Sequence, residues 1–176
     1  CPPRKPAMPH TTNKTLAQAE RIMLVSVLLS SQYTGSNQTR ERSFQAACAE
    51  AAELVRATGG ELIHSETAKR DKPHTALFVG TGKAEELAQL VQQHDIQLVV
   101  FNHELTPTQE RNLERTLQCR VLDRVGLILA IFAQRAQSQE GKLQVELAQL
   151  NHLSSRLVRG YGHLQSQKGG IGFKGP

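Results

Sequence analysis

The hydrophobic positions between residues 20 and 123 change their period repeatedly along the chain. Short and nearly continuous apolar runs, typical of strands buried on both faces, alternate with segments in which apolar residues recur every three or four positions, as in helices. We therefore predict an α/β fold with a small, mostly parallel sheet and flanking helices. The expected strands are 22–29, 61–65, 76–79, 97–101 and 120–122, and the expected helices are 43–58, 83–93 and 106–117.

Capping residues support two of the boundaries. Thr106 is expected to cap the third helix, with Pro107 in the first helical position, where its missing N–H costs nothing. Asp123 and Arg124 stand where the last strand gives way to a helix. We predict a helix cap with an ion pair there.

From residue 124 onward the pattern stays helical. Leu143, Leu147, Leu150 and Leu157 recur with the alternating spacing of a coiled-coil seam. Such a stripe needs a second helix, so we expect residues 124–159 to form the first arm of an antiparallel helical hairpin. The alternative is an ordinary amphipathic helix that packs its stripe back on the sheet.

The chain has a net charge of +5, and the excess of positive charge lies at its two ends. Residues 1–19 are basic, contain no acid and are rich in proline, which predicts a disordered lead-in. Residues 147–176 are also basic without an acid, so a contact with a polyanion is expected at the ends. The basic residues of the second end are Arg156, Arg159, Lys168 and Lys174.

Composition excludes several classes of protein. Apolar residues make up 39% and charged residues 21% of the chain, as in globular proteins. No apolar run approaches the ~20 residues of a membrane span, and no secretory signal is evident. The 3 cysteines are scattered, which argues against a disulfide framework and a zinc site and favours a reducing compartment.

The strongest candidate site lies in the second basic end. Arginine and lysine bind phosphates, tyrosine and histidine stack on exposed bases, and glycines allow close approach of a backbone. We expect residues 160–176 to be a glycine-rich basic loop at the hairpin tip that binds RNA; a flexible linker to a following domain is the alternative. The candidate residues are Arg156, Arg159, Gly160, Tyr161, His163, Gln167, Lys168 and Lys174.

A second, weaker candidate is the turn that contains Gly80, Gly82 and Lys83. It does not match a phosphate-binding P-loop, which would need glycine at Leu77 and a hydroxyl residue at Ala84. A nucleotide could still bind near this turn and His103, at the carboxyl ends of the strands. We expect no catalytic residue and no metal site in the chain.

Six segments of the chain resemble the N-terminal domain of the HflX family of ribosome-associated GTPases. Three lie in the helical part and three in the α/β part. They are GLILAIFAQRA (126–136), EGKLQVELAQL (140–150), QKGGIGFKGP (167–176), KRDKP (69–73), GTGKAEEL (80–87) and LTPTQERNLE (105–114).

The resemblance implies an α/β subdomain, then a long helical hairpin, then a GTP-binding domain. It implies a cytoplasmic protein that binds the 50S ribosomal subunit, with the hairpin loop at the peptidyl transferase region of 23S rRNA. Ribosome splitting, rescue or biogenesis under stress, driven by GTP, would be the role.

On this basis the chain is expected to divide at 1–19, 20–123, 124–159 and 160–176 and to stop before the return helix and the G domain. GTP and Mg²⁺ would bind in that G domain, so the fragment itself is expected to hold no cofactor and to catalyse nothing. Two alternatives are a nucleotide-binding α/β module, and a scaffold that regulates the G domain without contacting RNA.

Overall fold

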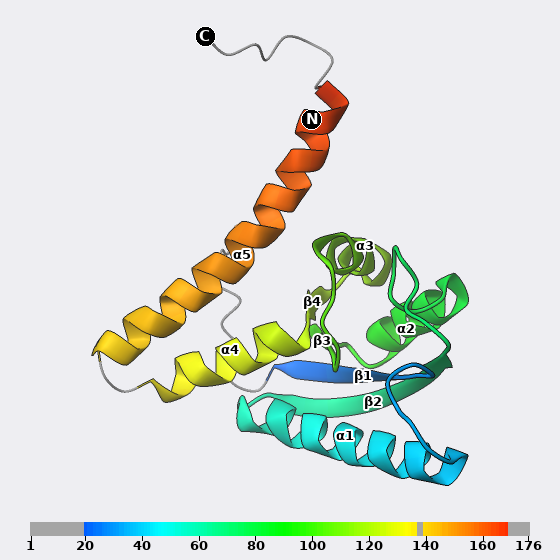
Figure 1. The fold of residues 1–176 in the computed structure, drawn as a ribbon. Coiled ribbons are helices and arrows are strands. Elements are labelled where there is room, and N and C mark those ends of the chain that lie inside the picture. Colours follow the sequence, from blue (N-terminus) through cyan, green and yellow to red (C-terminus); the bar gives the residue numbers. More distant parts are fainter. Residues whose placement is uncertain (1–19, 137–138, 169–176) are drawn as a thin grey trace, which may run out of the picture.

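A parallel sheet with helices on both faces forms the body of the molecule, and one long helix projects from it (Figure 1). This computed structural model describes residues 20–136 and 139–168, with residues 156–168 as backbone only. The predicted lead-in at 1–19 lies outside the described residues.

The sheet confirms the predicted α/β class. Its strand order is β2-β1-β3-β4, and every neighbouring pair is parallel. Since parallel neighbours require crossover connections, each strand is followed by a helix that covers one face. The strands are β1 (Arg21–Leu29), β2 (Glu61–Arg70), β3 (Leu98–Phe101) and β4 (Arg120–Leu122).

Alternate residues of β1 divide the interior into two cores. Met23, Val25 and Val27 face one core, which α2 (Thr81–Gln93) and α3 (Pro107–Leu117) cover. The intervening residues Ile22 and Leu24 face the other core, beneath α1 and α4. Side chains of a strand alternate between its faces, so a run of apolar residues without alternation is what a doubly covered strand requires. The helices of the second face are α1 (Asn37–Ala57) and α4 (Arg124–Arg135).

Both predicted helix caps are present. The Thr106 side chain accepts a hydrogen bond from Gln109 N at 3.1 Å, and the Gln109 side-chain Oε1 accepts one from Thr106 N at 2.9 Å, which completes a capping box. Asp123 caps α4, with its Oδ1 accepting from Gly126 N at 2.9 Å. These local bonds set the directions in which α3 and α4 leave the sheet.

The strand predicted at 76–79 is wrong, and the described sheet has four strands instead of five. A tight loop occupies this segment, closed by two backbone hydrogen bonds of 2.9 Å between His74 and Phe78. Phe78 has a φ of 64°, a left-handed conformation that no strand contains. Phe78 and Val79 are apolar because the loop inserts them into the core beside α2, not because they belong to the sheet.

Two further elements are longer than predicted. The first helix begins at Asn37, six residues before the expected start, because Ser36 caps it from within a polar and exposed stretch. The second strand continues past residue 65 to Arg70, where its residues alternate between exposed and half-buried positions. In both cases the apolar signal is weak because only one side of the element is covered.

Replacing Gln118 by glycine is expected to stabilise the fold by up to about 1 kcal/mol. Gln118 ends α3 with φ 51° and ψ 41°, a conformation that glycine adopts without steric cost. The free energy of unfolding in urea measures the gain. Gln118→Ala is the control, since it loses the side-chain hydrogen bond to Arg115 O while keeping the unfavourable φ. A less stable glycine variant would contradict the prediction.

Candidate functional site

The long helix α5 (Gln139–Lys168) carries most of the RNA-binding candidates on its distal half. Its 30 residues span about 45 Å at ~1.5 Å per residue, and Figure 1 shows it rising past the body. Residues 160–168, predicted as loop, are helical, because glycine weakens a helix without breaking it. Lys174 lies outside the described residues. The candidates on the backbone of α5 are Arg156, Arg159, Gly160, Tyr161, His163, Gln167 and Lys168.

A contact in the middle of α5 holds it against the body. His152 Nε2 lies 3.7 Å from Asp123 Oδ1, and the Asp123 side chain is 1% exposed. Asp123 Oδ2 also accepts a hydrogen bond from Leu105 N at 3.3 Å. The residue that caps α4 therefore also helps to orient α5, whose distal half continues beyond this contact.

The apolar stripe of α5 is exposed over its proximal half. Leu143, Leu147 and Leu150 are 56%, 58% and 61% exposed, and Phe132 on α4 is 55% exposed. The stripe therefore does not pack back on the sheet, which was the alternative that the spacing left open. The side chain of Leu157 lies outside the described set.

The lysine at the start of α2, Lys83, forms ion pairs with two glutamates. Lys83 Nζ lies 2.7 Å from Glu66 Oε1 and 3.4 Å from Glu86 Oε1. Burial works to lower the pKa of Lys83, but the hydrogen bond and charge of Glu66 raise it above its usual value. Gly80 begins the helix without a side-chain cap, and Gly82 faces open space. A phosphate at this turn would have to compete with two carboxylates for the lysine.

His103 has a structural role at the end of β3. Its Nε2 accepts a hydrogen bond from Val27 N at 2.8 Å, and its ring centroid lies 4.8 Å from that of Phe78. Burial, and then the charge of Arg124, lower the pKa of His103 to about 4. The imidazole is therefore neutral near pH 7, and its acceptor nitrogen is already used by the backbone of β1.

The exposed face of α3 carries two arginines, Arg111 and Arg115, that sequence reasoning passed over. In the sequence they stand among glutamates, as in any solvated helix of mixed charge. In the structure Glu110 is buried at 8% exposure and Glu114 is half-buried, whereas both arginines are exposed. The signal available beforehand was the spacing of four residues, which places both arginines on one face.

Two kinds of site are absent from the described parts of the chain. In residues 20–136 and 139–168, no helix combines the length and the hydropathy needed to cross a bilayer. The same residues contain no group of three histidine, cysteine or acidic side chains arranged to hold a metal ion.

Family models match most of the chain. The model described as GTP-binding GTPase N-terminal matches residues 45–133, and the one described as GTP-binding GTPase Middle Region matches residues 135–176. A GTPase HflX of Escherichia coli is 58% identical over 123 residues, 70% of this chain. The chain belongs to the HflX GTPase family.

The chain spans less than a third of the length of two similar HflX proteins. It covers 29% of the Escherichia coli protein and 30% of the GTPase HflX of Flavobacterium psychrophilum, to which it is 45% identical over 123 residues. That second match also covers 70% of this chain. The chain therefore corresponds to the N-terminal portion of an HflX GTPase.

Solved structures show the same fold as this HflX chain. A GTP-binding protein from the archaeon Sulfolobus solfataricus, crystallised with GDP, matches with a TM-score of 0.57 and 23% identity over 86% of this chain and 42% of that chain. A mutant of SsGBP matches with a TM-score of 0.59 and 23% identity, covering 81% of this chain and 41% of that chain.

Proposed function

We propose that this chain is the ribosome-binding N-terminal part of an HflX GTPase that acts in the cytoplasm. Its distal helix and the residues beyond would bind 23S rRNA of the 50S subunit near the peptidyl transferase region. The whole protein would split or rescue ribosomes, with GTP and Mg²⁺ bound in its G domain.

One observation carries the proposal: a helix of 30 residues projects from the body and ends in a segment with basic residues and no acid. Figure 1 shows that this end lies far from the sheet. A rigid arm places its cations where the body does not obstruct a large polyanion, and cations determine most of the affinity of a protein for nucleic acid. Phosphate contacts are assigned to Arg156, Arg159, Lys168 and Lys174, and base stacking to Tyr161 and His163.

We also propose that a return helix of the whole protein packs along α5, and the exposed leucine stripe supports this. Leu143, Leu147 and Leu150 are each more than half exposed. Leucines repeated at this spacing pack well against a second helix, whereas their exposure to water is unfavourable. We place the intramolecular partner of the chain on this stripe.

The nucleotide-binding alternative has less support than the RNA-binding function. Lys83 is paired with Glu66 and Glu86, and His103 is neutral and bonded to Val27 N. The cation and the imidazole that would contact a phosphate are both engaged. We therefore propose no nucleotide site in the α/β body.

Replacing Arg159 and Lys168 by alanine in the full-length protein is expected to weaken binding to isolated 50S subunits about tenfold or more at ~0.1 M salt. The slope of log affinity against log salt should fall by about 2, since each lost phosphate contact removes about one unit. Arg42→Ala with Lys72→Ala is the matched control, because it removes the same charge from exposed positions on the body. Unchanged affinity and slope in the Arg159/Lys168 variant would overturn the proposal.

A further inference from the structure

The exposed face of α3 carries two neighbouring arginines that form no ion pair with a described acid. Arg111 and Arg115 are exposed and one helical turn apart, with the exposed Thr108 on the same face. Among the described side chains, no carboxylate lies within 4.0 Å of either guanidinium. The face therefore presents two uncompensated positive charges and a hydroxyl group.

Some exposed cations elsewhere on the body have acidic partners, whereas others, such as Arg42 and Lys72, form no ion pair with a described side chain. Arg56 pairs with Glu53 on α1 at 2.7 Å, and Lys69 of β2 pairs with Glu41 at 3.5 Å. Arg111 and Arg115 are four residues apart on α3, a spacing that places both charges on one face of the helix.

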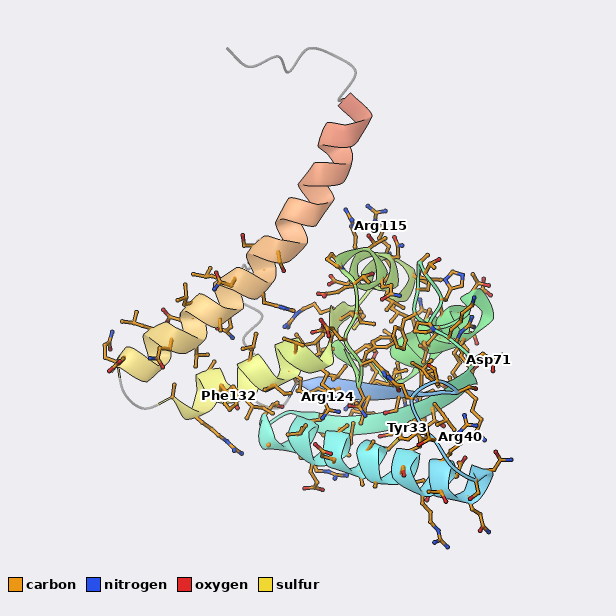
Figure 2. All side chains as sticks on the ribbon, viewed as in Figure 1. Tyr33, Arg40, Asp71, Arg115, Arg124 and Phe132 are labelled. Carbon is orange, nitrogen blue, oxygen red and sulfur yellow. The ribbon has the colours of Figure 1, made fainter. Side chains whose placement is uncertain are left out.

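The position of α3 links this face to the arm. α3 packs against α5, and Figure 2 shows Arg115, in the last turn of α3, pointing away from the sheet. A large ligand bound along the distal half of α5 would therefore extend over the arginines of α3.

The chemistry of the face favours nucleic acid over protein as the partner. Protein interfaces are built around buried apolar anchors, and the large hydrophobic side chains that are exposed in the described part lie on α4 and α5 instead. Arginine surrounded by hydroxyl and amide groups is the combination that binds phosphate oxygens. The hydroxyl group here is that of Thr108, which is exposed on the same face.

We infer that Arg111 and Arg115 form a second phosphate-binding surface, which holds the backbone of the same rRNA that the arm binds. This inference rests on the proposed function, because the arm supplies the RNA. The arm would provide base contacts at the tip, whereas α3 would contribute position and charge without reading sequence.

The test measures binding of full-length protein to isolated 50S subunits over a range of salt concentrations. Arg111→Ala with Arg115→Ala is expected to lower affinity about tenfold or more at ~0.1 M salt and to reduce the salt slope by about 2. Arg111→Lys with Arg115→Lys keeps both charges and is expected to retain most of the slope. The Arg42/Lys72 double-alanine control should match wild type, and thermal melting should show that every variant is folded.

The outcomes separate this inference from the proposed function. If the Arg159/Lys168 variant binds weakly and the Arg111/Arg115 alanine variant binds like wild type, the inference is overturned and the proposed function stands. If only the Arg111/Arg115 variant loses affinity and slope, α3 binds rRNA phosphate without the arm, and the proposed function of the arm is overturned. A change in GTP turnover without ribosomes, with an unchanged salt slope, would identify α3 as a contact of the G domain and overturn the inference.

Discussion

Lowering the pH from 6.5 to 4 is expected to destabilise the α/β body by up to about 3 kcal/mol through His103 alone. Burial, and then Arg124, lower the pKa of this imidazole to about 4 in the folded state, against about 6.5 in the unfolded chain. Between about pH 6.5 and pH 4 the unfolded chain therefore binds a proton at His103 that the folded protein does not bind. The free energy of unfolding decreases as the pH is lowered through this range.

The structural reason is the hydrogen bond at 2.8 Å from Val27 N to His103 Nε2. A proton on that nitrogen would place two donors against each other, beside the Phe78 ring. His103→Gln keeps an amide oxygen that can accept from Val27 N and has no charge to gain. Urea denaturation of both proteins between pH 7 and pH 4 isolates the effect, since the other titrating groups cancel in the difference. Parallel curves for the two proteins would contradict the prediction.

Replacing Asp123 by alanine is expected to cost about 3 kcal/mol of stability. The carboxylate is buried and accepts hydrogen bonds from Gly126 N at 2.9 Å and Leu105 N at 3.3 Å. A helix cap contributes about 1 kcal/mol, and a hydrogen bond to a charged group ~1.5–3 kcal/mol. The same change removes the contact between His152 and Asp123, so faster amide exchange is expected in the middle of α5.

Two variants divide this loss between the body and the arm. Asp123→Asn keeps one acceptor oxygen for the cap of α4 and is expected to cost about half as much. His152→Ala removes the 3.7 Å contact while leaving the Asp123 carboxylate in place, and is expected to cost less than about 1 kcal/mol. The measurements are the free energy of unfolding and amide exchange of α5. A stable Asp123→Ala variant would show that the junction does not depend on this carboxylate.

Local signals in the sequence were sufficient for most elements of the fold. The apolar run at 22–29 predicts a strand buried on both faces, because each face of β1 lies in its own core. Thr106 and Asp123 predict helix starts, because a cap depends on residues three positions away. The apolar run at 76–79 gave a wrong strand prediction, because such a run indicates burial and not backbone conformation. The left-handed φ of Phe78 has no counterpart in hydrophobic spacing.

Some features of the candidate sites could be identified from the sequence, and others only from the structure. The acid-free basic end is a property of composition, so the sequence alone identifies it. The pairing of Lys83 with Glu66 and the neutral state of His103 depend on contacts between separate strands and helices. The exposed arginines of α3 depend on which side of that helix the core covers. By itself the sequence determined most of the elements, the basic end and the leucine stripe, because each is encoded within a few turns of chain. Only the tertiary structure decided which charges are neutralised and which remain available, because charge compensation acts between residues that are distant in the chain.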